Sequence, residues 1–206
     1  MALPLCAGKN DGATAAVALV TNIGGAWTPG PVRPYIMGRN DQGPQAMTIK
    51  AGDTIPSVKI MQATAEGPKE VDTGEFFKGK TVALFGVPGA FTPTCSAKHL
   101  PGFVTNAAAL KAKGVDAIAC VSVNDAFVMG AWAKDQGITD QVVMLADGSA
   151  NFTKAMGLEF DLTARGLGVR SQRFALIAKD GKVTHVAVEA PGAFEVSKAE
   201  AILEIL

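Results

Sequence analysis

Apolar residues gather into short runs along most of the chain, and the spacing within each run predicts its element. Continuous apolar runs of the kind buried on both faces of a parallel sheet predict strands over 80–86, 116–123 and 142–145. Apolar positions at helical spacing predict three helices: from about Thr94 to Lys113, over 125–135 and over 150–156. The second of these helices has Asn124 or Asp125 as its predicted cap. Its predicted apolar stripe consists of Phe127, Val128, Ala131 and Trp132. This alternation of strand and helix predicts an α/β domain.

Antiparallel elements flank this alternating part on both sides. The alternating segment 57–61, the turn Gly67-Pro68 and the segment 70–71 predict a small N-terminal β-hairpin, followed by a helical turn over 73–78. Two further apolar segments flank Asp180-Gly181 and predict a second hairpin, 173–179 with 182–188, before a final helix that Ser197 caps. The order predicts a thioredoxin-like fold, with a central mixed sheet flanked by helices and an N-terminal β-hairpin extension.

Residues 1–46 differ from the rest of the chain. They are rich in Gly and Pro, lack periodicity, and contain Cys6 but no serine. We interpret them as a non-globular extension, with three origins left open: an artefactual extension ahead of a start site at Met47, a targeting segment, or a real appendage. Residues 47–206 then form the folded domain. The location predicted is the cytoplasm, or the chloroplast or mitochondrion if residues 1–46 are a transit peptide.

Charge and cysteine content narrow the function. Nineteen basic and nineteen acidic side chains cancel without long blocks of one sign, so neither a nucleic acid nor an anionic membrane is indicated as a partner. No apolar run reaches the roughly 18 to 20 residues of a membrane span, which predicts a soluble protein. Three irregularly spaced cysteines form neither a secreted disulfide framework nor a zinc-site pattern, and favour reduced thiols in an intracellular compartment.

Cys95 stands where a strand, a loop rich in Gly and Pro, and a helix start meet. Free N–H groups and the dipole of a helix N-terminus favour a negative charge, so Cys95 is a candidate thiolate nucleophile. Pro88 stiffens the loop, and Thr92 precedes Cys95 by one helical turn, which brings its hydroxyl to the sulfur's side. Pro101 is expected to kink or split the helix after its first turn. On composition alone, a lone cysteine at a helix start is more often a small buried apolar residue than a nucleophile.

Several separated motifs carry a family resemblance. The segment PGAFTPTCS at 88–96 resembles the active-site loop of peroxiredoxins, and HLPGF, CVSVNDAFVM and GLGVRSQRF at 99–103, 120–129 and 166–174 are similar to the type II or peroxiredoxin-5 branch. The likeness runs from about Met47 to the C-terminus. It implies a peroxidatic Cys95, with Thr92 and Arg173 organising the peroxide; Arg170 is a second candidate arginine. It also implies chemistry without metal, haem or flavin.

The resemblance implies a thiol peroxidase of cell redox homeostasis that reduces hydrogen peroxide and alkyl hydroperoxides through a cysteine sulfenic acid. The reductant expected is glutaredoxin with glutathione, or thioredoxin, and the assembly expected is a homodimer, to which Phe91 and Phe127 are candidate contacts. The alternative function is a non-enzymatic peroxide sensor or chaperone that uses Cys95 as a switch. A protein-disulfide oxidoreductase is disfavoured because Cys95 opens Cys-Ser-Ala-Lys and not CxxC.

Two residues near Cys95 have open roles. Cys120 follows it by 25 residues, a separation at which plant-type members are proposed to form a resolving disulfide; here it falls inside a predicted buried strand, so it is either a resolving thiol or a core residue. A bridge needs Cα atoms within roughly 7 Å, which would require the first helical turn to unfold. His99 follows Cys95 by four residues, and we assign it to packing or capping because no third partner for acyl or metal chemistry is visible.

Overall fold

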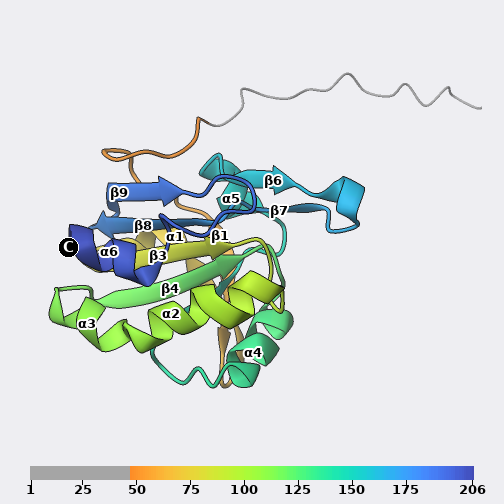
Figure 1. Cartoon of the computed structure of the whole chain (residues 1–206), viewed down its shortest axis with the longest axis horizontal. Helices are drawn as coiled ribbons and strands as arrows, with labels where there is room; N and C mark the ends of the chain where they lie inside the picture. Colours follow the sequence, from red (N-terminus) through yellow and green to blue (C-terminus); the bar gives the residue numbers. More distant parts are fainter. Residues whose placement is uncertain (1–46) are drawn as a thin grey trace, which may run out of the picture. The chain divides into compact units, whose positions relative to one another are not determined.

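A computed structural model describes residues 47–206, which form a mixed seven-stranded sheet in the order β2-β1-β5-β4-β3-β8-β9 (Figure 1). The strands of this sheet are β1 Lys59–Thr64, β2 Gly67–Asp72, β3 Thr81–Val87, β4 Ala117–Ser122, β5 Val143–Ala146, β8 Phe174–Lys179 and β9 Lys182–Val188. Strands β3, β4 and β5 run parallel, whereas β8 lies antiparallel to both β3 and β9. The predicted thioredoxin-like mixed sheet is therefore confirmed.

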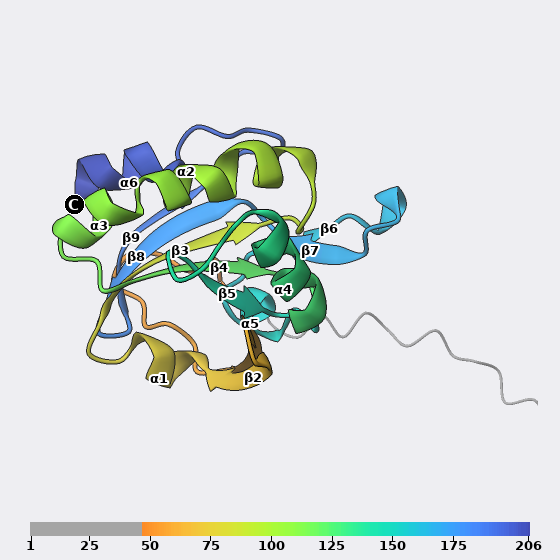
Figure 2. The same ribbon diagram turned by 90° about the horizontal axis from the view of Figure 1, so that it is seen from below.

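Helices cover both faces of the sheet. They are α1 Thr73–Phe77, α2 Leu100–Thr105, α3 Ala107–Ala112, α4 Ala126–Asp135, α5 Asn151–Ala155 and α6 Ala199–Ile205. Figure 2 shows α2, α3 and α6 on one side and α1 on the other. Odd and even positions of a strand point to opposite faces, so Phe85 and Cys120 pack with the α2 side while Leu84 and Val121 pack with α1 and α5.

The N-terminal hairpin is the edge of the central sheet and not a separate extension. Strand β1 pairs antiparallel with β5, which joins the hairpin to the core strands. The prediction of a turn at Gly67-Pro68 was wrong, because both residues lie in β2 and pair with Thr64 and Ala63. A proline has no N–H to donate to a neighbouring strand, but β2 is the outermost strand of the sheet and has a neighbour on one side only.

The helix that follows the active-site loop changes type once and is interrupted once. Cys95–His99 form a π-helical turn that passes directly into α2 at Leu100, with helical backbone at both His99 and Leu100. The predicted kink or split at Pro101 is therefore a change of helix type and not a gap in the helix. The interruption, at Asn106, was not predicted. The Asn106 side chain donates to the carbonyl of Gly102 at 2.9 Å, a local bond that competes with a regular helix.

Helix α4 buries Trp132 as predicted, but the rest of its buried face differs from the predicted stripe. Its buried residues are Ala126, Met129 and Trp132, whereas Phe127 is 76% exposed. This helix is apolar all round, so the sequence does not identify which side is buried. Asp125 is its cap, accepting from the N–H of Val128 at 2.9 Å.

The structure settles two further local predictions and adds one element that was not predicted. The second hairpin is confirmed, and its turn residues Asp180 and Gly181 both have positive φ, at 48° and 73°. The predicted Ser197 cap was wrong, because Lys198 is the N-cap of α6 and the buried Ser197 hydroxyl donates to Glu189. A small hairpin that was not predicted, β6 Glu159–Asp161 with β7 Val169–Ser171, projects away from the main sheet and carries a 3-10 turn, Thr163–Arg165 (Figure 1).

The interpretations of residues 1–46 as an extension, and of Cys6 within them, lie outside the described residues.

Candidate active site

Cys95 is the first residue of the π-helical turn and is fully buried. The loop before it is held from the neighbouring strand, because Asn124 Oδ1 accepts from the N–H of Ala90 at 3.0 Å and from Ser122 Oγ at 2.7 Å. The turn after it is held by α4, where Trp132 Nε1 donates to Ser96 Oγ at 3.0 Å. These bonds hold the segments immediately before and after Cys95 in place. A π-helical turn is itself uncommon and is frequent at functional sites.

The register of β3 and β8 brings Arg173 to the thiol. Phe174 pairs with Gly86, and a side chain at Gly86 would collide with the Phe174 ring, since its Cβ would lie 2.0 Å from that ring. The glycine therefore lets β8 close on β3 with Arg173 beside the start of the loop. Arg173 Nη1 donates to Cys95 Sγ at 3.4 Å, across 78 residues of sequence. A guanidinium supplies a charged donor, so this is a charge-assisted hydrogen bond to the sulfur.

Thr92 and Pro88 lie in the loop, and each forms a hydrogen bond with a neighbouring residue. Thr92 Oγ1 donates to the carbonyl of Gly89 at 2.9 Å. A hydroxyl has one hydrogen, so this bond leaves Thr92 with lone pairs to accept from a ligand. The carbonyl of Pro88 accepts from Arg170 Nη1 at 3.4 Å. Arg170 thus supports the loop, whereas Arg173 meets the sulfur.

His99 belongs to the site, although its assignment to packing or capping did not anticipate this. Its Nδ1 lies 3.1 Å from Arg173 Nη1 and its Nε2 lies 3.0 Å from the carbonyl oxygen of Ser197. Burial and then the charge of Arg173 lower the pKa of His99 from 6.5 to about 3, against the opposing effect of the Ser197 bond. The imidazole is therefore neutral near pH 7. The four-residue spacing between Cys95 and His99 was the only sign in the sequence that the two side chains are close. The sequence does not show that His99 contacts Arg173, because Arg173 lies 74 residues away.

Residues 189–197, here called the C-terminal strap, close the site beside His99. Phe194 packs against both His99 and Arg173, with its ring centre 5.0 Å from that of His99, at a tilt of 60°, and 5.7 Å from the guanidinium carbon of Arg173. Glu189 Oε1 accepts from the Ser197 N–H at 2.8 Å and from the Ser197 hydroxyl at 2.9 Å. Neither Phe194 nor Glu189 was singled out from the sequence, because their contacts cross between separate elements.

Cys120 lies in the middle of β4, level with Phe85 on β3 and Met144 on β5. It is buried and free, like Cys95, and belongs to the same apolar cluster on one face of the sheet. Burial raises the pKa of the Cys120 thiol well above its ordinary value, and the charge of Cys95 raises it further. Cys120 is thus a neutral thiol in the core.

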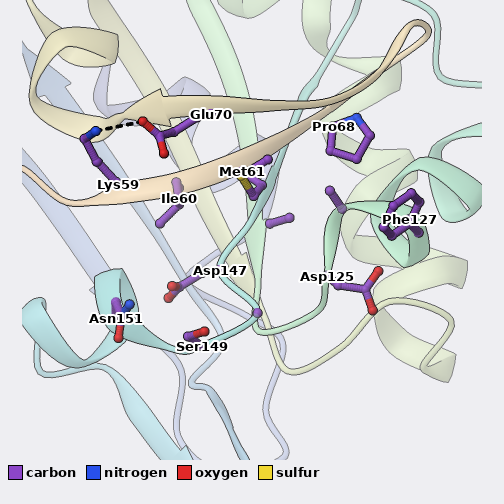
Figure 3. Close-up of a pocket in the computed structure, with 13 residues that line it drawn as sticks. Lys59, Ile60, Met61, Pro68, Glu70, Asp125, Phe127, Asp147, Ser149 and Asn151 are labelled. Carbon is purple, nitrogen blue, oxygen red and sulfur yellow. Dashed lines mark hydrogen bonds and ion pairs between the residues drawn. The ribbon is translucent and has the colours of Figure 1, made fainter.

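A cavity of about 200 Å³ opens at the site between the loop, the strap and the β6–β7 hairpin. Its lining joins Pro88 and Arg173 to Phe160, Leu162 and Pro191. A larger hollow of about 460 Å³, shown in Figure 3, lies between the first hairpin and the start of α4, and holds Phe127 and the Lys59–Glu70 ion pair but neither described cysteine. The smaller cavity is lined by Arg173 and Pro88, although it too includes neither described cysteine.

Two kinds of feature are absent from residues 47–206. No group of three or more His, Cys, Asp or Glu side chains in this range is placed to hold a metal ion. No helix in this part of the chain has the length and apolar character needed to cross a membrane.

Comparison with known proteins identifies the class. A protein-family model described as Redoxin matches residues 50–203. Peroxiredoxin-2B of Arabidopsis thaliana is 59% identical over 161 residues, which cover 77% of this chain and 98% of that protein. The chloroplastic Peroxiredoxin-2E of the same plant is 48% identical over 167 residues, covering 79% and 71%. The crystal structure of reduced Prx3 in complex with H2O2 from Vibrio vulnificus matches with a TM-score of 0.74 and 55% identity, covering 77% of this chain and 99% of that one.

The chain therefore belongs to the redoxin family. Within it, the sequence places the chain among the type II peroxiredoxins, which confirms the resemblance drawn from the loop and strand motifs. The protein is a peroxiredoxin, an antioxidant enzyme that reduces peroxides with electrons from a thiol reductant.

Proposed function

We propose that Cys95 is the peroxidatic nucleophile and that Arg173, Thr92 and Pro88 prepare it and its substrate. The observation that carries this proposal is the contact between Arg173 Nη1 and Cys95 Sγ. The thiolate attacks one peroxide oxygen; the S–O bond forms as the O–O bond breaks, and the leaving oxygen takes up a proton. The products are a sulfenic acid on Cys95 and water or an alcohol.

Each neighbour has a separate task in this step. The remaining N–H groups of Arg173 donate to the peroxide oxygens as charge develops on the leaving oxygen. Thr92 accepts from the peroxide hydroxyl, since its own hydrogen is bonded to Gly89. Pro88 keeps the loop carbonyl in place against Arg170. No metal, haem or flavin is required by this sequence of bonds.

The proposed substrates are hydrogen peroxide and alkyl hydroperoxides. The apolar walls that Phe160, Leu162 and Pro191 give to the cavity suit an alkyl group, while the Arg173 end suits the peroxide. The reduced Prx3 of Vibrio vulnificus, a relative of this chain, crystallises in complex with H2O2, which supports the smaller of these substrates.

The sulfenic acid is returned to the thiolate by glutaredoxin with glutathione or by thioredoxin, with Cys120 as a candidate resolving thiol. Both sulfurs lie in one apolar cluster, which supports an intramolecular bridge. The bridge requires the π-helical turn to open, because Cys120 is locked in the centre of the sheet. Peroxide treatment followed by non-reducing peptide mapping separates the routes: a Cys95–Cys120 bridge supports Cys120, and a glutathione adduct on Cys95 supports an external thiol.

A homodimer formed through the surface around the active-site loop is part of the proposal. Phe91 is 53% exposed and Phe127 76% exposed, a large apolar area for a free surface. Figure 3 shows Phe127 at the hollow beside the first hairpin. Sedimentation of wild type and of a Phe127→Glu variant tests the contact. An unchanged dimer in the variant, or a monomer in wild type, contradicts it.

We propose a cytoplasmic enzyme whose peroxidase domain is residues 47–206. The chloroplast and the mitochondrion are the alternatives, and the chloroplast has the support that two relatives carry that location in their names. Imaging of the full chain with a C-terminal fluorescent tag distinguishes the three compartments.

Steady-state turnover tests catalysis against the sensor or chaperone alternative. With excess hydrogen peroxide and either glutaredoxin and glutathione or thioredoxin, the enzyme should consume many peroxides per Cys95. Consumption that stops near one peroxide per Cys95 with every reductant would support the sensor and refute the enzyme.

A further inference from the structure

The loop before Cys95 contains a residue with an unfavourable backbone conformation. Gly89 to Thr92 form a turn, because the Thr92 N–H and the Thr92 hydroxyl both donate to the Gly89 carbonyl, at 3.4 and 2.9 Å. The third residue of this turn, Phe91, has a φ of 60°. Such a turn position favours glycine, since a Cβ atom crowds the backbone in the left-handed region. The cost for other residues corresponds to a population that is roughly 5- to 30-fold smaller.

The ring of Phe91 does not hold this conformation by packing into the core. It is 53% exposed and belongs to neither apolar cluster of the described residues. The ends of the turn are fixed instead. A Cβ atom on Gly89 would lie 2.9 Å from Arg170 Nη1, so the turn begins close against that side chain. At the other end, the Thr92 carbonyl accepts from the Ser96 N–H at 3.0 Å, which joins the turn to the segment that carries the thiol.

Asn124 holds the middle of the turn. Its Oδ1 accepts from the N–H of Ala90 at 3.0 Å and from the Ser122 hydroxyl at 2.7 Å. Both partners are donors, so the oxygen of the Asn124 amide, and not its nitrogen, must face them. The Ser122 hydroxyl lies farther from the Val87 carbonyl, at 3.4 Å, so its one hydrogen is directed to Asn124. Ser122 is buried at the end of β4, and the sheet therefore sets where the Asn124 side chain lies.

We propose that Asn124 is a positioning residue that keeps Phe91 in its left-handed conformation and thereby sets the position of Thr92. Ala90 directly precedes Phe91, so the bond to its N–H fixes the plane of the peptide at which the turn begins. Without this bond, Phe91 should relax to a negative φ, and Thr92, the next residue, moves with it. The inference rests on the proposed role of Thr92 as acceptor for the peroxide hydroxyl, and adds a residue at the end of another strand that places this acceptor.

Substitutions at two positions separate the backbone strain from the side chains. Asn124→Ala removes the acceptor for the turn. Phe91→Gly, added to that variant, lets the turn adopt a positive φ without cost. Phe91→Ala, added instead, also removes the ring but keeps the Cβ atom and therefore the strain. The control outside the loop is Asn106→Ala, which also removes an amide with two hydrogen bonds, one to the Gly102 carbonyl and one to Glu200.

The readout is the rate of Cys95 oxidation by hydrogen peroxide in a single turnover, measured by stopped flow, beside the rate of Cys95 alkylation by iodoacetamide. Asn124→Ala leaves the Ala90 N–H without its partner, so oxidation should fall by ~10-fold. Adding Phe91→Gly should restore most of that loss, and adding Phe91→Ala should not. Asn106→Ala should stay within about threefold of wild type. Alkylation needs no alignment of a peroxide, so it should change by less than about threefold in every variant.

Equal oxidation rates for the two double variants, or equal losses in oxidation and alkylation for Asn124→Ala, would overturn the positioning role. Absence of peroxide reduction by the wild type would instead refute the proposed function. If Asn124→Ala does not fold, Ser122→Ala replaces it in the same comparison, because it removes the donor that orients the Asn124 amide. Faster oxidation after adding Phe91→Gly than after adding Phe91→Ala is then expected, and equal rates overturn the proposal.

Discussion

Cys95 and Cys120 are both fully buried thiols in one apolar cluster, yet the structure gives them different surroundings. Cys95 begins a π-helical turn and receives a hydrogen bond from Arg173. Cys120 lies inside a strand, and burial raises its pKa well above the ordinary value. Burial by itself therefore does not decide whether a thiol reacts. A fixed cation and an irregular backbone distinguish Cys95, the proposed nucleophile, from Cys120.

Replacing the reactive thiol should have the largest effect. Cys95→Ser removes the nucleophile while keeping the size of the side chain, so peroxide reduction should fall by at least about 10³-fold. The measurement is hydrogen peroxide consumption with excess thiol reductant, with circular dichroism as the check on folding. Substantial turnover by a folded Cys95→Ser protein would remove Cys95 from the centre of the mechanism.

Replacing Arg173, the cation beside Cys95, is the next test of the difference between Cys95 and Cys120. Arg173→Gln should lower the rate of single-turnover oxidation by ~10²- to 10³-fold, the usual loss when a donor to a developing anion is removed. Arg170→Gln is the matched control, because Arg170 donates to the carbonyls of Pro88 and Leu167 and not to the sulfur. It should cost less than about tenfold. Similar losses in the two variants would mean that loop support, and not contact with the sulfur, is what the arginines supply.

Local parts of the fold were predictable from the sequence. The parallel strands and the Asp180-Gly181 hairpin follow from short-range patterns, and the structure has both. The buried face of α4 did not follow, because Phe127 and Met129 are both apolar and only packing against the sheet separates them.

The motif residues of the site were predictable from the sequence, but the hydrogen bonds that join them to distant residues were not. Cys95 and Thr92 share one loop with a recognisable pattern, and Arg173 came from the family resemblance. His99 meets Arg173 and Ser197 across 74 and 98 residues, and no local pattern encodes contacts of that range. Their formation depends on the register of β8 and on the fold of the strap.

Acid stability tests the neutral state of His99. Its pKa is lowered from 6.5 to about 3, so below pH 6.5 the unfolded chain binds a proton that the folded protein does not. The free energy of unfolding should therefore fall as the pH drops from 6.5 toward 3, with about 3 kcal/mol of the loss at pH 4 due to this group. His99→Asn should lack that part of the loss. Urea unfolding at pH 7 and pH 4 measures it, and equal losses in both proteins would contradict the lowered pKa.

Replacing Cys120 should have the smallest effect on peroxide reduction. Cys120→Ala leaves Arg173 and the π-helical turn in place, so single-turnover oxidation should stay within about threefold of wild type. Stability should fall by about 1 to 2 kcal/mol, because a small cavity is left in the core. Stopped-flow oxidation and urea unfolding report the two quantities. A tenfold fall in the oxidation rate would show that Cys120 takes part before the sulfenic acid forms.

The most direct test of the account is to locate the first oxidised sulfur. Reduced protein is mixed with one equivalent of hydrogen peroxide in the presence of dimedone, quenched within the first turnover and mapped by mass spectrometry. Every early product, whether a dimedone adduct or a disulfide, should include Cys95, and no dimedone should be found on Cys120. A sulfenic acid trapped on Cys120 while Cys95 remains a free thiol would contradict the central claim.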